Sequence, residues 1–304
     1  MKASATAAAL VGAAGVVCQT ASLTLRFVTY NIRWATPVVG PNEAYWSARR
    51  PRLAAQLNYE TAARPESLLC MQEVVERQLL DVAEDLGPAW AHVGVGRDDG
   101  AAAGEFSPIF YRPGAWDLVE NRTYWLSETP DVPGSKGWDA GLPRIATVAS
   151  FRHAATGLPL VYMCTHFDDQ GRTARERSAE LLVRVAGEWE SKGTPAVPVF
   201  LGGDLNAEPD DAAYRTLVAE GGLRDARDAV PEARRTGNSK TYTAFTDADW
   251  DDMLIDHVFV RDPAVRGMRF LSHAVLPNRF DDRLFISDHR PVVVDAQVCV
   301  EAAA

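Results

Sequence analysis

Residues 197–206 read VPVFLGGDLN, an apolar run that ends at two glycines and continues into an acid and an amide. The apolar residues predict a buried strand, and Gly202 and Gly203 mark its end. Because side chains alternate along an extended chain, Asp204 and Asn206 share one face. A carboxylate beside a carboxamide can hold a cation or an attacking water molecule. The segment therefore predicts a polar site at the end of a buried strand.

Four more polar segments interrupt strand-like sequence in the same way. They are YNIR at 30–33, MQEV at 71–74, CTHFD at 164–168 and ISDHRP at 286–291. Sites are usually built where strand ends meet loops. Five such segments in one chain predict that they meet in one active site.

The composition is that of a globular protein in water. Of the 304 residues, 47% are hydrophobic and 24% are charged. No tandem repeat or long linker divides the chain, so we expect one domain over residues 23–300. The net charge of −10 disfavours a protein that scans DNA, because phosphate neutralisation supplies most non-specific affinity for nucleic acid. It does not argue against a metal-dependent enzyme, whose cation attracts a phosphate locally.

Residues 1–22 have the features of a weak secretory signal, with Lys2, an alanine-rich apolar stretch and small residues up to Ser22. A disordered leader is the alternative. We therefore expect a secreted protein, with a cytoplasmic location as the second reading. The stretch is too short and too weakly apolar to cross a membrane. Cys70 and Cys164 lie in apolar runs and are expected to be small buried hydrophobes, since no disulfide framework or zinc spacing is visible.

Hydrophobic periodicity predicts both strands and helices. The clearest helix covers 174–189, and further helices are expected over 44–59 and 75–86. The expected strands are 23–30, 68–72, 106–111, 116–126, 144–151, 158–165, 197–201, 253–260 and 291–298. The order mixes hairpin and crossover connections. The α/β architecture that fits best is a four-layer α/β/β/α sandwich of two packed, mostly antiparallel mixed sheets.

Two acids stand out at the ends of apolar segments. Glu73 directly follows the apolar strand 68–72, and Asp288 lies beside His289. A carboxylate at a buried strand end costs free energy unless it is paired or ligates a cation. Each acid alone fits a salt bridge as well as a metal site. Ligands that are all oxygen favour Mg²⁺, Mn²⁺ or Ca²⁺ over zinc, and Mg²⁺ is the cofactor we expect.

Two histidines and two arginines complete the set of reactive side chains. His166 and His289 each end an apolar stretch and have acids nearby. Histidine is suited to proton transfer near neutral pH, and a carboxylate partner fixes its tautomer and raises its pKa. Arg33 and Arg144 are candidate clamps for phosphate oxygens. The alternative for each histidine taken alone is a structural role, and the alternative for each arginine taken alone is a surface ion pair.

In this order the five segments resemble the endonuclease/exonuclease/phosphatase superfamily, and most closely its deoxyribonuclease-I-like branch. The likeness runs from about residue 23 to residue 298. GDLN at 203–206 and SDH at 287–289 are its most specific parts. The resemblance implies that Asn31 and Glu73 bind the divalent cation and that Asp288 completes the ligand set. It also implies that Asp204 and Asn206 orient the nucleophilic water and the scissile phosphate.

The same resemblance pairs each histidine with an acid. His289 is expected to act as an acid, a base or a phosphate-stabilising group, held by Asp256. His166 is expected as the second histidine, with Glu105 as its partner. The two arginines would contact phosphate oxygens. Which histidine is the base and which is the acid stays open.

The reaction implied is in-line attack of water on a phosphate ester. The leading reading is a cation-dependent phosphodiesterase or nuclease, acting as a monomer. The second is a phosphatase or phosphodiesterase on small or lipid-linked phosphates, of the inositol phosphate or sphingomyelin type. The third is an inactive relative that serves as a binding protein, although Glu73, Asp204 and His289 are all present. One superfamily performs all these reactions with one site, so the fold does not choose between them.

Overall fold

The computed structural model of the chain describes residues 22–193, 196–248, 253–262 and 268–299. The leader expected over residues 1–22 therefore lies outside the described residues, except for Ser22, where the first strand begins. No helix among these residues has the length and apolar character that crossing a bilayer requires.

Most strands belong to two large sheets. The seven-stranded sheet has, in spatial order, β12 (Arg235–Gly237), β14 (Arg269–Val275), β15 (Val292–Cys299), β1 (Ser22–Asn31), β2 (Ser67–Gln72), β6 (Ile109–Tyr111) and β4 (Ala91–Val93). The six-stranded sheet has β11 (Arg224–Asp225), β13 (Asp256–Arg261), β10 (Val199–Asp204), β9 (Pro159–His166), β8 (Ile145–His153) and β7 (Trp116–Trp125). A small third sheet pairs β3 (Val74–Val75) with β5 (Glu105–Phe106).

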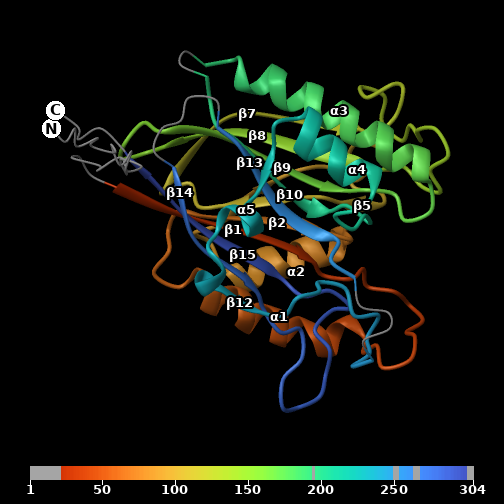
Figure 1. The fold of residues 1–304 in the computed structure, drawn as a ribbon. Helices are drawn as coiled ribbons and strands as arrows, with labels where there is room; N and C mark the ends of the chain where they lie inside the picture. The colour runs from red at the N-terminus through yellow and green to blue at the C-terminus, as the bar shows by residue number, and fades with distance from the viewer. Residues whose placement is uncertain (1–21, 194–195, 249–252, 263–267, 300–304) are drawn as a thin grey trace, which may run out of the picture.

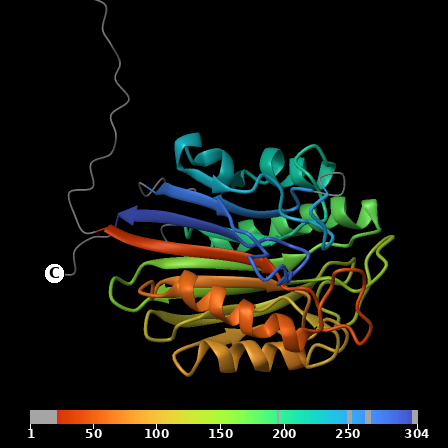
Figure 2. The ribbon, with the colours of Figure 1, turned by 90° about the horizontal axis from the view of Figure 1, so that it is seen from below.

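The helices cover the outer faces of the two large sheets, as Figures 1 and 2 show. The first side carries α1 (Trp46–Thr61) and α2 (Glu76–Leu86), whose apolar residues pack on β1 and β2. The other side carries α3 (Arg172–Glu190), α4 (Ala212–Arg215) and a π-helix (Thr216–Glu220), packed on β9 and β10. The short α5 (Ala226–Ala229) and a 3₁₀ helix (Glu232–Arg234) lie near β14. The expected four-layer sandwich is confirmed.

The pairing of strands is mixed and mostly antiparallel, as expected. Three pairs are parallel, β1 with β2, β9 with β10 and β12 with β14. The other pairs within the large sheets are antiparallel. Parallel neighbours end at the same edge of a sheet, so the polar residues after β1 and β2, and after β9 and β10, are placed together.

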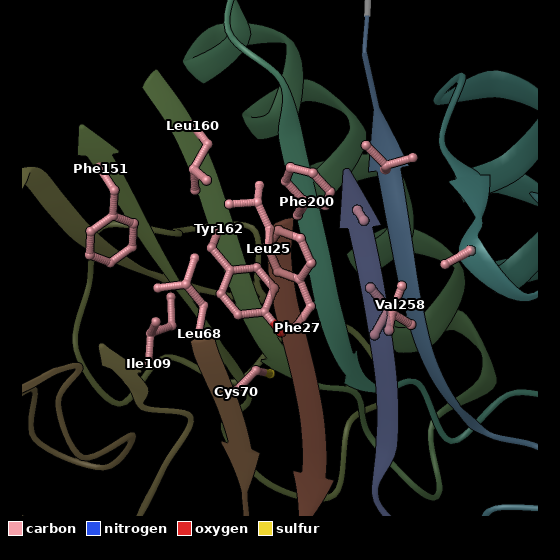
Figure 3. Close-up of a cluster of buried hydrophobic side chains, with 14 of the residues drawn as sticks. Leu25, Phe27, Leu68, Cys70, Ile109, Phe151, Leu160, Tyr162, Phe200 and Val258 are labelled. Carbon is pink, nitrogen blue, oxygen red and sulfur yellow. The ribbon is translucent and has the colours of Figure 1, made fainter. Parts of the chain in front are cut away.

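Alternation along the strands divides the core into layers. Phe27 points between the sheets and stacks on Phe200 at a ring-centroid distance of 4.0 Å, whereas Val28 points toward α1 and α2. Figure 3 shows the inter-sheet cluster, in which the labelled side chains come from strands of both sheets. Tyr162 spans the interface and donates from its hydroxyl to the carbonyl of Val28 at 3.2 Å. Both sheets are therefore fixed relative to one another beneath the strand ends.

The expectation for the buried cysteines was wrong. Cys70 on β2 and Cys164 on β9 form a disulfide that joins the two sheets, with the Cα atoms 5.3 Å apart. They are 94 residues apart in the sequence, so no local spacing indicated the bond. Both cysteines face the space between the two sheets, and it is the packing of the sheets that brings their sulfur atoms together.

Candidate active site

The catalytic candidates of the six-stranded sheet lie in one row. The strand register places Asp204 beside His166 on β9 and beside Asp256 on β13. From the other sheet, Asn31 at the end of β1 donates its amide to Asp204 Oδ2 at 3.0 Å. The two sheets thus bring together residues that are as far apart in the sequence as Asn31 and Asp256.

His289 and Asp256 form a buried pair. Nδ1 of His289 lies 2.8 Å from Oδ2 of Asp256, and its Nε2 lies 3.6 Å from Oδ2 of Asp204. Burial alone would lower the pKa of His289, but the negative charges of Asp256 and Asp204 outweigh it and raise the pKa to about 10. The imidazole is therefore positively charged at neutral pH. The expected partnership of His289 with Asp256 is present in the geometry.

Asp204 is buried and receives two directed donors. The backbone N–H of Asn206 donates to its Oδ1 at 2.8 Å, and Asn31 donates to its Oδ2. Burial, together with the negative charge of Asp256, raises the pKa of Asp204 to about 7. A carboxylate with this pKa can exchange a proton near neutral pH. Asn206 has a positive φ of 45°, a conformation that asparagine tolerates better than most residues.

His166 is in a different electrostatic environment. Its Nδ1 lies 3.1 Å from Nη1 of Arg144, and its Nε2 lies 3.1 Å from the Asn206 amide. Burial and the positive charges of Arg144 and Arg97 hold the pKa of His166 well below its usual range. His166 is therefore neutral, and the expected rise in pKa from a carboxylate neighbour does not occur. The expected partner, Glu105, lies 3.8 Å away and pairs instead with Arg97 at 2.7 Å.

The residues expected to bind the cation gather on the other side of Asp204. Asn31 donates to Glu73 Oε1 at 2.9 Å, and the backbone N–H of Trp34 donates to Glu73 Oε2 at 3.1 Å. Burial and the nearby charge of Glu73 raise the pKa of Asp288, against the opposing charge of His289. Asp288 is buried and Glu73 is partly buried, and the nearby positive charge includes Arg33, whose Nη1 lies 3.8 Å from Glu73 Oε2. The oxygen atoms that these residues offer suit a hard divalent cation.

A second set of atoms meets the spacing for a metal. Asp204, Asp256 and His289 each offer one ligand atom, and these atoms lie within 4.8 Å of one another. However, the raised pKa of His289 means that a proton already balances these two carboxylates. A cation there would have to displace that proton, whereas the positive group beside Glu73 and Asp288 is Arg33, whose Nη1 lies 3.8 Å from Glu73 Oε2. The geometry therefore favours the expected ligand set, and the assignment of Asn31, Glu73 and Asp288 stays a prediction.

Both expected phosphate clamps are at the site, and both already have acidic partners. Arg33 pairs with Glu43 at 3.0 Å and keeps 28% of its side chain exposed. Arg144 is buried and pairs with Asp168 at 3.3 Å and Asp169 at 2.7 Å. These carboxylates hold the two guanidinium groups in place while leaving donors available to a phosphate. The functional and structural readings of these arginines are thus compatible.

The site opens into a cavity of about 420 Å³. Nine of the eleven expected residues line it, namely Arg33, Glu73, Glu105, Arg144, His166, Asp204, Asn206, Asp288 and His289. Asn31 and Asp256 lie behind it and touch lining residues. The remaining walls include Trp34, Leu142, Tyr242 and Met253. The Tyr242 ring packs against His289 at a centroid distance of 5.0 Å.

Sequence reasoning missed two buried arginines. Arg97 neutralises Glu105 and lowers the pKa of His166. Arg49 is 1% exposed and donates to backbone carbonyls on both sides of the site, among them Ile32 at 2.7 Å and Ile286 at 2.9 Å. Arg49 therefore ties the segment after Asn31 to the segment before Asp288. The only sequence signal was the basic character of the helix over 44–59, which does not distinguish it from the other arginines there.

Comparison with known proteins places these features in a family. The model of the endonuclease/exonuclease/phosphatase family matches residues 28–289. A protein of that family from Bacteroides thetaiotaomicron is 32% identical, with a TM-score of 0.80 and coverage of 92% of this chain and 96% of that one. One from Bacteroides vulgatus is 33% identical, with a TM-score of 0.80 over 91% and 99% of the two chains. A mannosyl-6-phosphatase from Bacteroides thetaiotaomicron is 33% identical, with a TM-score of 0.78 over 90% and 99%. No curated protein matches.

Proposed function

The chain belongs to the endonuclease/exonuclease/phosphatase family of phosphoester hydrolases, and on that basis we propose that it is a divalent-cation-dependent phosphatase acting on a small phosphorylated carbohydrate. The observation that carries the proposal is the cavity, whose volume of about 420 Å³ suits a small molecule. A net charge of −10 is unfavourable for a long polyanion. The likeness to a mannosyl-6-phosphatase adds support.

This proposal reverses the order of the two enzymatic readings of the sequence. Trp34 and Tyr242 border the cavity and offer faces on which either a sugar ring or a base can stack. A phosphodiesterase or nuclease is therefore the second candidate. The aromatic residues Trp34 and Tyr242 support this second candidate, whereas the cavity volume and the net charge of the protein favour the phosphatase.

In the proposed reaction Asp204 orients the attacking water and accepts its proton. Its pKa of about 7 suits this role near neutral pH. Asn206 donates its amide toward the same region, since Nδ2 lies 3.1 Å from His166 Nε2 at the floor of the cavity. Asp204 and Asn206 then position the water molecule on the side of the phosphorus atom that is opposite to the leaving oxygen.

The charged His289 stabilises the phosphoryl oxygens and supplies a proton to the leaving oxygen. Its positive charge is maintained by Asp256. Arg33 and Arg144 donate to the remaining phosphoryl oxygens, and neutral His166 donates from the one ring nitrogen that carries its proton. A cation bound by Asn31, Glu73 and Asp288 would offset negative charge on a phosphoryl oxygen and on the leaving oxygen.

Hydrolysis by the purified protein in Mg²⁺ or Mn²⁺, with a chelator control, tests the proposal. The substrates are mannose 6-phosphate, glucose 6-phosphate, an inositol polyphosphate, bis-p-nitrophenyl phosphate, an RNA oligomer and plasmid DNA. We expect chelator-sensitive release of phosphate from the hexose phosphates. Nicking of the plasmid with no turnover of the monoesters would replace the proposal with the nuclease, and silence on all substrates would favour the inactive relative.

We also propose that the protein is secreted. The Cys70–Cys164 disulfide supports this proposal, because disulfides persist in oxidising compartments. Fractionation of cells that express the full chain, with mass determination of the product, tests it. Recovery outside the cytoplasm with the leader removed is the expected result, whereas an uncleaved cytoplasmic protein would overturn it.

A further inference from the structure

A second polar cavity lies at the edge of the seven-stranded sheet, away from the catalytic pocket. Its volume is about 310 Å³, and none of its lining residues lines the catalytic pocket. Its lining residues include members of β12, β14, α5 and the 3₁₀ helix, and Figure 1 labels β12, β14 and α5. The parallel register aligns Arg235 with His273 and Gly237 with Val275. Arg235 and His273 are thus neighbours on the sheet, and Gly237 allows the close approach of the two strands, since a Cβ there would lie 2.0 Å from the carbonyl oxygen of Val275.

His273 lies at the floor of this cavity in an unusual state. The residue is only 5% exposed, yet no described residue forms a hydrogen bond with its ring. Burial lowers its pKa to about 4, helped by Arg227, His257 and Arg235 against the opposing charge of Asp225. The ring is therefore neutral, and it has one N–H group that can donate to a ligand. The positive charges of Arg227 and Arg235 lie nearby.

Two guanidinium groups flank His273 without acidic partners. Within the described ranges, neither Arg227 nor Arg235 forms an ion pair, and the one hydrogen bond of the Arg235 guanidinium is from Nε to the carbonyl of Val230 at 2.8 Å. By contrast, both arginines of the catalytic pocket pair with carboxylates. Glu232 is the one acidic residue among the described residues that line the cavity, and it forms no ion pair with either guanidinium group. The lining therefore carries a net positive charge, and positive charge in a concave site favours an anion.

We propose that this cavity binds a tetrahedral oxyanion, a phosphate or sulfate group, between Arg227 and Arg235 with His273 beneath it. Guanidinium forks match two oxygens of such a group, and the imidazole N–H reaches a third. Asn238 and Ser239 line the same cavity and supply further polar groups. The site is separate from catalysis and does not depend on the proposed substrate.

Histidine-ring NMR of the metal-free protein, in chelator, tests the site. The chain has six histidines, so the His273 signal is assigned by its loss in His273→Gln. Titrations in phosphate, sulfate and chloride at equal ionic strength are compared. An oxyanion beside the ring favours its charged form, so the His273 pKa should rise by about one unit or more in phosphate and in sulfate. Occupancy of the catalytic pocket is followed separately through the signals of His166 and His289.

Arginine variants supply the control. The double variant Arg227→Met/Arg235→Met should lose the shift, and the apparent Kd for phosphate at this site should rise at least tenfold. Arg234→Met is the matched control, because Arg234 is exposed next to Arg235 and does not line the cavity. If the double variant fails to fold, Arg235→Gln alone is used. The same His273 titration in all three salts, or an equal loss of the shift in Arg234→Met, would overturn the proposal.

Discussion

The protein contains two buried histidine–aspartate pairs that are almost identical locally. Nδ1 of His289 lies 2.8 Å from Asp256, and Nδ1 of His257 lies 2.9 Å from Asp225. Asp256 and His257 are consecutive in β13, so their side chains point to opposite faces of the six-stranded sheet. One pair therefore belongs to the active site and the other lies against the outer helices, where Tyr214 of α4 packs on His257 at a centroid distance of 5.0 Å.

The pairs differ in what surrounds them. Asp225 also accepts from the Tyr214 hydroxyl at 3.0 Å and from the backbone N–H of Arg227 at 2.8 Å, so its carboxylate is well satisfied. Nε2 of His257 is buried without a hydrogen-bond partner among the described residues, whereas Nε2 of His289 faces Asp204 and the cavity. A histidine–aspartate hydrogen bond alone therefore does not indicate a catalytic histidine. Access to a second carboxylate and to substrate decides it.

Removing the carboxylate of Asp204, which faces Nε2 of His289, should have the largest effect on activity. We expect Asp204→Asn to lower kcat by about 10³-fold or more, because an amide cannot accept the proton from water. Asp225→Asn is the matched control and should change kcat by less than about threefold, since it lies outside the catalytic cavity. Steady-state kinetics, with circular dichroism to confirm folding, measure both. A kcat above a tenth of the wild-type value in Asp204→Asn would remove Asp204 from the mechanism.

Exchanging each histidine for asparagine tests the pairs directly. His289→Asn should reduce kcat by about 10²-fold or more, because a positive charge beside the phosphoryl group is lost. His257→Asn should leave kcat nearly unchanged and lower the free energy of unfolding by about 1–3 kcal/mol, because buried partners lose a hydrogen bond. Kinetics and urea unfolding separate the two effects. Equal losses of kcat in both variants would contradict the division into a catalytic and a structural pair.

Cation dependence tests whether the His289–Asp256 pair holds a proton or a metal. Glu73→Gln should raise the cation concentration for half-maximal activity by about tenfold or more, because a charged ligand is lost. Asp256→Asn should leave that concentration unchanged if a proton balances the pair. Activity is titrated with Mg²⁺ in both variants. The opposite pattern would move the metal to Asp204, Asp256 and His289.

The smallest expected effect is a shift of the pH profile. The pKa of His289 is raised to about 10 by Asp256 and Asp204, so kcat/KM should fall at alkaline pH as the ring loses its proton. Removing the charge in Asp256→Asn disfavours the protonated ring, and the alkaline limb should therefore move to lower pH by about one unit or more. Asp225→Asn should leave that limb in place. An unmoved limb in Asp256→Asn would show that another group titrates there.

Much of the site could be predicted because its residues follow strand ends. Asp204 is the last residue of β10 and His166 the last of β9, so local apolar runs were enough to locate them. The strand was expected to stop at Gly202 and Gly203, but both glycines are paired within β10. Both Asp204 and Asn206 line the cavity, but the alternation that predicted a shared face does not apply to Asn206, because its φ of 45° takes the chain out of the extended conformation. Nine of the eleven expected residues line the cavity, among them Glu105, which was expected only from the family resemblance.

Other features depend on residues that are distant in the sequence. Glu105 lies 3.8 Å from His166, as the expected pairing requires, but the buried Arg97 forms a shorter contact with the same carboxylate oxygen, at 2.7 Å. The disulfide between Cys70 and Cys164 and the five-carbonyl anchoring by Arg49 likewise have no local pattern. Each arises from packing between layers, which sequence periodicity does not specify.

The sequence by itself determined the family, the four-layer fold and the identity of the polar residues at the strand ends, because these depend on hydrophobic periodicity and short segments. Only the tertiary structure decided the protonation states, with His289 charged and His166 neutral, since a pKa depends on burial and on every charge nearby. It also decided which histidine–aspartate pair faces the cavity. Asp256 and His257 are consecutive in β13, so their side chains point to opposite faces of the sheet. Which face lines the cavity and which is covered by helices depends on how the layers pack.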